Sequence, residues 1–418
     1  MKRFNLAAFS ANHGTRRTVA AGFALVWLLG LLGCQEYPNQ DRMWLDARIN
    51  GHSVTMAVDT GASSTLLFQT AALDLGLKIT SQPPDPALRS YQVVFGATEP
   101  CDLTIWGATT RAPLAVVKVP PYAHFDVDGV VGWPAVRDRI FQFDAAANKM
   151  TPLDKVPDDV ATWTKLAVRS RFNIMSLEIT LPDGSTGWML VDTGSQMGVT
   201  LTPARWQEWR QAHPKEPVTM RAHYTPSTGP VAGEESWAHQ LTLGPLVIHE
   251  VPVAEADPHE IPVVQAGANA PAFISEQYVG TLGMTALKRL DFILDGPQGV
   301  AYLRPKLTQP QPYEHNRIGA VFMPLDATSE VLTARVVPGS PADLAGIRNG
   351  DILTYINGHP AGQWREKTSV GLPNFEWQDF YDDKVFLRVI QGSEENRLTV
   401  HMQDIIGPGS PDFKSSLP

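Results

Sequence analysis

The chain contains an internal repeat built around the tripeptide Asp-Thr-Gly, which begins at Asp59 and again at Asp192. Before each copy, apolar and polar residues alternate on both sides of a turn sequence, Asn50-Gly51 in the first copy and Asp183-Gly184 in the second. This pattern predicts a β-hairpin that delivers the tripeptide as a loop. The repeat therefore predicts two similar β-rich lobes in tandem.

A second pair of matching segments follows the two loops at a similar distance. Gly129-Val130-Val131-Gly132 leads into an apolar stretch that ends at Asp144, and Gly280-Thr281-Leu282-Gly283 leads into one that ends at Asp295. The two stretches align without a gap. A single Asp-Thr-Gly has roughly a one in ten chance of occurring in a chain of this length. Two copies with the same downstream partner therefore indicate a duplicated unit.

These segments resemble the retropepsin and pepsin clan of aspartic peptidases, and most closely the bacterial retropepsin-like proteins. In that clan, an apolar-apolar-Gly segment passes beneath each loop and is followed by a short helix, here residues 284–290, and a closing strand, here residues 292–295. The resemblance covers residues 44–155 and 165–306. It implies a mainly β fold with two retropepsin-like β-barrel lobes related by a pseudo-twofold axis. A monomer and a dimer with lobes paired between chains both stay open.

The resemblance implies that Asp59 and Asp192 form a catalytic pair and that no cofactor is needed. Hydrolysis of an amide by water needs a base and an acid close to the same atom. Two neighbouring carboxyl groups serve both purposes, because like charges that close cannot both ionise and one proton is shared. Aspartic proteases are the standard example of this behaviour.

The remaining loop residues are expected to fix this geometry. Gly61 and Gly194 permit tight loops and let backbone N–H groups approach the carboxylates. By resemblance, Thr60 and Thr193 form hydrogen bonds to the opposite loop.

The two loops differ after the glycine, which predicts two electrically unequal aspartates. By resemblance, Ser195 forms a hydrogen bond with the outer oxygen of Asp192, whereas Ala62 at the equivalent place has no hydroxyl group. The clan also closes a β-hairpin flap over its substrate. Residues 88–96 and residues 224–233 are the candidates for it.

A different pattern begins after a Pro-rich linker at residues 307–314. Ser340-Pro341 predicts a capped one-turn helix that ends at Gly346, and Asn357-Gly358 predicts a turn between strands. The order resembles an α+β PDZ domain over residues 315–402. The resemblance implies a groove helix at residues 375–381 and a last strand at residues 385–390. The terminal segment, residues 403–418, is expected to be a disordered tail.

PDZ domains add an extended peptide as an extra strand and often hold its terminal carboxylate in a loop of backbone N–H groups. The matching loop here consists of Ile318, Gly319, Ala320 and Val321. The family has a second glycine where Ala320 stands. Peptide binding and a structural or intramolecular docking role therefore both stay open.

The N-terminus predicts a signal peptide over residues 1–33, because basic residues precede an apolar run that is too short to cross about 30 Å of hydrocarbon. Leu31-Leu32-Gly33-Cys34 resembles a bacterial lipobox. The resemblance implies a lipid on Cys34, a tether at residues 34–43 and, because Gln35 follows, an outer membrane lipoprotein that faces the periplasm. An ordinary signal peptide with a chance cysteine is the alternative.

The formal net charge of -9 disfavours nucleic acid as a partner. Cys101 is the second of 2 cysteines and is predicted to be a small buried residue. No zinc motif is recognised, since His249-Glu250 lacks the second histidine of a metal-binding helix. The first hypothesis is therefore an aspartic endopeptidase that cleaves envelope or periplasmic proteins. The second is a catalytically silent, peptide-binding lipoprotein adaptor that uses the same cleft and the PDZ-like groove.

Overall fold

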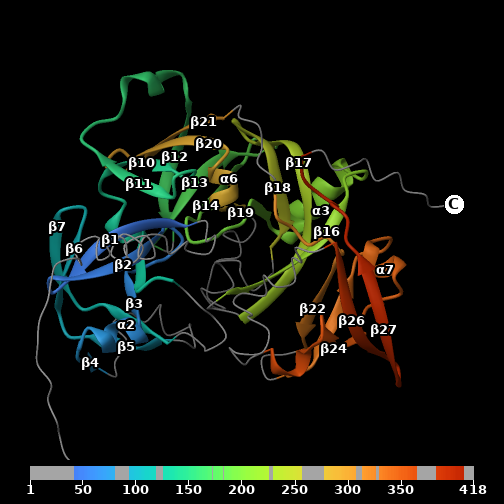
Figure 1. Cartoon of the computed structure of the whole chain (residues 1–418). Coiled ribbons are helices and arrows are strands. Elements are labelled where there is room, and N and C mark those ends of the chain that lie inside the picture. Colours follow the sequence, from blue (N-terminus) through green and yellow to red (C-terminus); the bar gives the residue numbers. More distant parts are fainter. Residues whose placement is uncertain are drawn as a thin grey trace, which may run out of the picture. The chain divides into compact units, whose positions relative to one another are not determined.

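The computed structural model describes residues 42–80, 94–118, 126–171, 173–181, 183–225, 229–256, 277–306, 313–325, 329–364 and 383–408 (Figure 1). The fold is mainly β, with 53% of residues in strands and 12% in helices, and this confirms the predicted fold class. The predicted signal peptide, Cys34 and nearly all of the tether lie outside the described residues. No helix in the described part of the chain is long and apolar enough to span a membrane.

The first lobe consists mostly of short strands. Its elements are β1 (Met43–Ile49), β2 (His52–Asp59), β3 (Leu66–Phe68), α2 (Gln69–Asp74), β4 (Ile79–Thr80), β5 (Val94–Thr98), β6 (Cys101–Ile105), β7 (Ala108–Ala112), β8 (Ala115–Val117), β9 (Gly129–Gly132), β10 (Ile140–Asp144) and β11 (Lys149–Leu153).

The second lobe repeats this plan with longer hairpins. Its elements are β12 (Thr164–Arg171), β13 (Ile174–Thr180), β14 (Thr186–Val191), β15 (Val199–Leu201), α3 (Pro203–Ala212), β16 (Val218–Thr225), β17 (Gly229–Leu243), β18 (Leu246–Glu255), β19 (Tyr278–Leu282), α6 (Met284–Leu287), β20 (Leu290–Asp295) and β21 (Val300–Pro305).

Strand pairing confirms that the two lobes are repeats. β2 runs parallel to β9 in the first lobe, and β14 runs parallel to β19 in the second. β3 and β15 then pair antiparallel with β9 and β19, and parallel with β8 and β18. The predicted hairpin turn at Asn50-Gly51 has φ angles of 48° and 85°, which are the positive values that a two-residue hairpin of this kind requires.

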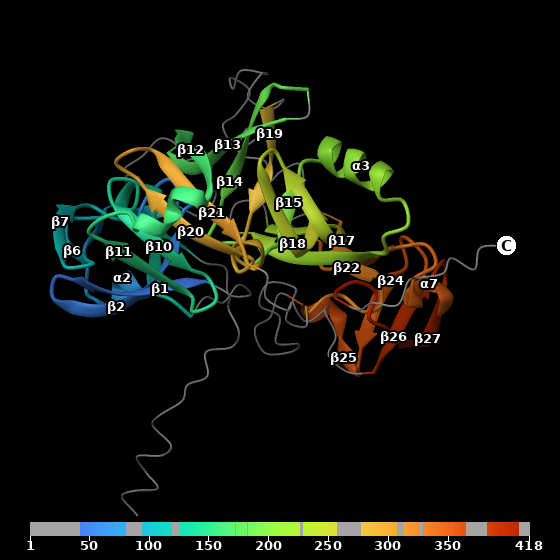
Figure 2. The same cartoon turned by 90° about the horizontal axis from the view of Figure 1, so that it is seen from above.

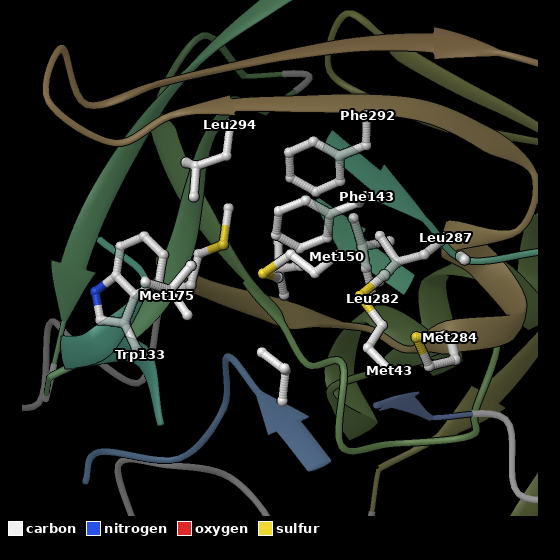
Figure 3. Close-up of a cluster of buried hydrophobic side chains, with 14 of the residues drawn as sticks. Met43, Trp133, Phe143, Met150, Met175, Leu282, Met284, Leu287, Phe292 and Leu294 are labelled. Carbon is white, nitrogen blue, oxygen red and sulfur yellow. The ribbon is translucent and has the colours of Figure 1, made fainter. Parts of the chain in front are cut away.

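The lobes are joined through a shared sheet and a shared core. β10 pairs antiparallel with β20, so the two strands lie side by side in both views (Figures 1 and 2). Phe143 lies opposite Phe292 in this register, and their rings stack with centroids 4.4 Å apart (Figure 3). One cluster of buried side chains includes residues of both lobes, among them Met43 and Leu282. The two loops are therefore carried by one continuous β structure.

The predicted helix at residues 284–290 is shorter than expected. α6 ends at Leu287, and β20 already begins at Leu290. Leu290 is fully buried and pairs with Pro305 in the β20–β21 hairpin. Leu290, the last residue of the predicted helix, therefore belongs to a strand instead, because it pairs with a distant part of the chain.

The C-terminal module is a small sheet with short helical turns. Its elements are β22 (Ala320–Pro324), β23 (Leu332–Val336), α7 (Pro341–Leu344), β24 (Ile352–Ile356), β25 (His359–Pro360), β26 (Lys384–Gln391) and β27 (Glu394–His401).

The predicted capped helix of the module is confirmed. Ser340 caps α7 by accepting a hydrogen bond from the Asp343 backbone N–H at 3.3 Å, and Gly346 has the positive φ of 97° expected at a helix end. The predicted last strand, residues 385–390, corresponds to β26, but β27 follows it and pairs with it along its whole length. The predicted groove helix, residues 375–381, lies outside the described residues.

The prediction of a disordered tail over residues 403–418 is wrong for its first residues, which are ordered. Ile405 and Ile406 are only 4% and 1% exposed, and they pack against Trp237 of β17. Apolar burial therefore holds the chain in place beyond β27, as far as the described residues extend.

Candidate active site

Each Asp-Thr-Gly loop begins where a buried central strand ends. Asp59 is the last residue of β2 and lies opposite Gly132 in the parallel β2–β9 pair. Asp192 directly follows β14, and its backbone N–H donates to the carbonyl of Leu282 at 2.9 Å. The two aspartates are thus anchored to equivalent strands of the two lobes.

The glycine-rich strands pass so close beneath the loops that no side chain would fit. A Cβ on Gly132 would lie 2.5 Å from the carbonyl oxygen of Ser64, and one on Gly283 would lie 2.4 Å from that of Met197. The backbone N–H groups that follow these glycines, in Trp133 and Met284, donate back to the loops. The repeated glycines are therefore a requirement of close backbone approach.

The two loops are held together by a symmetric set of buried hydrogen bonds. The Thr60 hydroxyl donates to the carbonyl of Val191 at 2.5 Å, and the Thr193 hydroxyl donates to that of Val58 at 2.6 Å. Each threonine backbone N–H donates to the opposite hydroxyl oxygen, at 3.1 and 3.2 Å. Both threonines are fully buried. The structure therefore brings the two threonines together across the lobes, as the sequence predicted.

The glycines of the motif bring the two aspartates together. A Cβ on Gly194 would lie 2.5 Å from Cγ of Asp59, and one on Gly61 would lie 2.7 Å from Cγ of Asp192. Each carboxylate also accepts a hydrogen bond from the glycine of its own loop, at 2.8 Å for Asp59 and 2.9 Å for Asp192. Each carboxyl group is therefore enclosed by both loops.

The two carboxyl groups form a hydrogen bond with each other, and both keep part of their surface exposed. Burial raises the pKa of Asp59. Burial and the neighbouring charge of Asp59 together raise the pKa of Asp192 well above its ordinary value. The two groups titrate as a pair that keeps one proton more readily than two separate aspartates would.

Arg42 makes the two aspartates unequal. Its positive charge opposes the rise in the pKa of Asp59. Arg42 belongs to the predicted tether, residues 34–43. The turn sequence Asn50-Gly51 nevertheless contained enough information to predict its position beside Asp59. A two-residue turn at residues 50 and 51 places Met43 opposite Val58, so the preceding residue lies beside Asp59.

Ser195 acts differently from its predicted role. Its hydroxyl oxygen accepts a hydrogen bond from the backbone N–H of Met197 at 3.3 Å. The backbone N–H of Ser195 donates to the backbone carbonyl of Asp192 at 3.3 Å, as that of Ala62 donates to the backbone carbonyl of Asp59 at 3.1 Å. The backbone N–H groups of the two loops therefore support their aspartates in the same way. The difference between the aspartates comes first from the pair itself, because the charge of Asp59 raises the pKa of Asp192, and then from Arg42, whose charge opposes the rise in the pKa of Asp59.

Of the candidate flaps, only residues 94–96 of the first belong to the described part of the chain. The second, residues 224–233, belongs to the β16–β17 hairpin, whose residues 226–228 are outside it. Cys101 is 2% exposed, as predicted. Among the described residues, no group of three or more acidic, cysteine or histidine side chains is placed to hold a metal ion.

The predicted peptide-binding loop of the module lies at the start of β22 and is enclosed. Ile318, Ala320 and Val321 are fully buried. The side-chain oxygen of Asn316 accepts hydrogen bonds from the backbone N–H groups of Ile318 and Gly319, at 3.1 and 3.0 Å. Two N–H groups of the loop are therefore occupied within the chain. Sequence reasoning did not single out Asn316.

In each lobe an Asp-Thr-Gly loop lies against a glycine-rich strand, and the two loops meet between the lobes. The aspartyl protease family model matches residues 45–120 and 177–286, and the PDZ domain model matches residues 333–368. These parts of the chain are thus similar to aspartyl proteases and to PDZ domains.

Among solved structures, the crystal structure of the aspartic proteinase from Irpex lacteus is similar to this chain. The similarity covers 63% of this chain and 94% of that chain, at 13% sequence identity and a TM-score of 0.39. A search of curated proteins finds no match.

Proposed function

We propose that the chain is an aspartic endopeptidase in which Asp59 and Asp192 activate one water molecule to hydrolyse a peptide bond. The observation that carries the proposal is the contact of each loop glycine with the carboxyl group of the opposite loop. This contact, together with the hydrogen bond between the aspartates, supports a reaction in which one proton is shared.

The proposed roles follow from the charges around the pair. Asp59, which lies near Arg42, is the carboxylate that takes a proton from the attacking water. Asp192, whose pKa is raised further, holds the shared proton and donates it to the carbonyl oxygen of the substrate. In the resulting tetrahedral intermediate the leaving nitrogen receives the proton from Asp59, the C–N bond breaks, and one hydroxyl group of the carbon returns its proton to Asp192 as the carboxyl product forms. Water attack and carbonyl polarisation thus occur at one carbon atom.

The proposed substrate is an extended segment of an envelope or periplasmic protein. This part of the proposal depends on the predicted signal peptide and the lipid on Cys34. If the Cys34 thiol carries the lipid, Cys34→Ser moves the protein from the outer membrane fraction to the soluble periplasmic fraction. Unchanged fractionation of this variant would contradict the anchor and leave the chemistry untouched. A monomer is proposed, since both carboxyl groups come from one chain.

The test of the chemistry is cleavage of a peptide library from acidic to neutral pH by the native chain, Asp59→Asn and Asp192→Asn. We expect each substitution to lower kcat by about 10²–10⁴-fold, because each removes one partner of the proton transfer. Asp46→Asn is the matched control, because Asp46 is exposed on the neighbouring strand β1. It is expected to keep native activity.

Two results would overturn the proposal. If the native chain and both variants were equally inert at every pH but still bound peptides, the protein would be an adaptor that uses the same cleft. If only one of the two substitutions lowered activity, the shared pair would be wrong.

A further inference from the structure

The β16–β17 hairpin of the second lobe and strand β22 of the module share one apolar core. Met220 and Ala222 of β16 belong to the same buried cluster as Ile318 and Phe322. Four consecutive residues of β22, from Ala320 to Met323, are buried, although neighbouring side chains of a strand point to opposite faces. Both faces of β22 are therefore covered, and the β16–β17 hairpin contributes to this cover.

Buried hydrogen bonds connect the same two parts. The hydroxyl of Thr219 in β16 donates to the backbone carbonyl of Asn316 at 2.5 Å. The hydroxyl of Tyr313 donates to the carboxylate of Glu235 in β17 at 2.6 Å, and Glu235 is only 2% exposed. Arg221 forms an ion pair with the same carboxylate at 3.3 Å. The ion pair lies within the hairpin, so separation of the two parts would break only the two hydrogen bonds of the Thr219 and Tyr313 hydroxyl groups.

The chain beyond β27 adds a third connection. Ile405 and Ile406 pack on Trp237 of β17, beside Tyr313. His315 accepts hydrogen bonds at Nε2 from the backbone N–H groups of both isoleucines, at 3.1 and 3.4 Å. The module thus contacts the β16–β17 hairpin through the residues before β22 and through those after β27.

The loop that would hold a peptide terminus is occupied from within. The oxygen of the Asn316 amide accepts from two consecutive N–H groups, as one oxygen of a carboxylate would, and its nitrogen donates to the carbonyl of Ala320 at 2.7 Å. Asn316 is 1% exposed. A peptide carboxylate would have to displace this buried amide.

We propose that the PDZ domain is a fixed intramolecular partner of the β16–β17 hairpin, with Asn316 in the place of a terminal carboxylate. The native chain therefore does not capture free peptide C-termini at this loop. The inference does not depend on the catalytic proposal, because it concerns contacts away from Asp59 and Asp192.

The first experiment measures hydrogen–deuterium exchange in β16 and β17 of the full chain. Thr219→Val and Tyr313→Phe each remove one hydroxyl and keep the shape of the side chain. We expect the double variant to exchange roughly tenfold faster in these two strands, because two buried hydrogen bonds are lost. Exchange in the β13–β14 hairpin of the same lobe is expected to stay native.

The control is the double variant Thr242→Val and Tyr355→Phe, which makes the same chemical changes at an exposed position of β17 and within the module. If both double variants exchanged alike in β16 and β17, the module would not support the hairpin and the proposal would fail.

The second experiment uses pools of N-terminally labelled hexapeptides, each with a free or an amidated C-terminus, and measures fluorescence anisotropy with the native chain. We expect both forms to give the same signal up to about 1 mM peptide. Binding of any carboxylate pool at least about tenfold tighter than its amide would show an open loop and overturn the role assigned to Asn316.

Discussion

Gly194 lies against the carboxyl group of Asp59, so closely that a Cβ at this position would be 2.5 Å from Cγ and 2.5 Å from Oδ2 of the aspartate. Real Cβ atoms do not approach other atoms this closely, and the aspartate is held by its own loop. The glycine therefore sets the separation of the two loops.

Gly194→Ala is expected to lower kcat/KM for peptide cleavage strongly, because the new methyl group must push the two carboxyl groups apart. A displacement of about 1 Å at a catalytic group lowers activity by roughly 10²-fold. Gly362→Ala is the matched control, since nothing lies within 4 Å of a Cβ there. Steady-state kinetics of both variants would decide the matter, and a Gly194→Ala enzyme with native kcat/KM would contradict the tight contact.

Thr60→Val is expected to lower the free energy of unfolding by about 2–4 kcal/mol, because it leaves the Thr193 N–H and the Val191 carbonyl without partners in the core. Urea unfolding followed by circular dichroism measures this difference. Thr60→Ser keeps the hydroxyl and should recover most of the loss. Equal destabilisation by valine and serine would show that the methyl group, rather than the hydrogen bonds, matters.

The aspartate pair is expected to make the folded state less stable as pH rises. The pKa of both groups is raised above the ordinary value of 3.8, mainly by burial, so the folded chain retains a proton that the unfolded chain has already released. Stability therefore falls from pH 3.8 upward through the raised pKa. Asp192→Asn removes this effect and should unfold at a higher temperature than the native chain at pH 7, but not at pH 3.

Asp183→Asn is the control for this experiment, and its effect has the opposite sign. The hydroxyl of Ser185 lowers the pKa of the exposed Asp183, so this carboxylate contributes stability above pH 3.8 and loses it as pH falls. Its replacement should lower the unfolding temperature slightly at pH 7. An unfolding temperature of Asp192→Asn below the native value at pH 7 would contradict the raised pKa.

Arg42→Gln is expected to move the acidic limb of the pH profile of kcat/KM to higher pH. Loss of the positive charge lets burial raise the pKa of Asp59 further, so the carboxylate form of the pair appears only at higher pH. Arg48→Gln is the matched control, because Arg48 is exposed on β1, the strand that begins directly after Arg42, about 20 Å further along. The same shift in both variants would indicate a general charge effect.

The sequence predicted those features of the fold that depend on local signals. The Asn50-Gly51 turn fixes the β1–β2 register, and the glycines at residues 129, 132, 280 and 283 mark the strands beneath the loops. These residues allow few backbone alternatives, so their pattern was sufficient to bring Asp59 and Asp192 into one candidate site.

Contacts between distant parts of the chain could not be predicted in this way. Thr219 and Asn316 are 97 residues apart, and neither residue type in isolation signals a buried interface. The same holds for Ile405, which was predicted to lie in a disordered tail but packs beside Trp237. Ser195 was assigned by resemblance, and its hydroxyl instead turns to the backbone of Met197.

The chain end at Ile405 and Ile406 is expected to contribute stability that depends on His315. Burial lowers the pKa of His315 below 6.5, in spite of the hydrogen bond to the Tyr313 carbonyl and the charges of Glu235 and Asp404, while Arg317 lowers it further. Neutral His315 accepts the two isoleucine N–H groups at Nε2. The unfolded chain takes up a proton before the folded one does, so stability is lost as pH falls from 6.5 towards the lowered pKa.

Truncation after residue 403 is therefore expected to lower the free energy of unfolding by about 3 kcal/mol at pH 7.5, since two buried isoleucines are lost. Truncation after residue 408, which keeps both isoleucines, is the reference. The difference between the two truncated chains should shrink as pH falls below 6.5 towards the lowered pKa of His315, because protonated Nε2 can no longer accept a hydrogen bond. Urea unfolding at each pH measures it, and a difference that stayed constant would show that His315 does not hold the chain end.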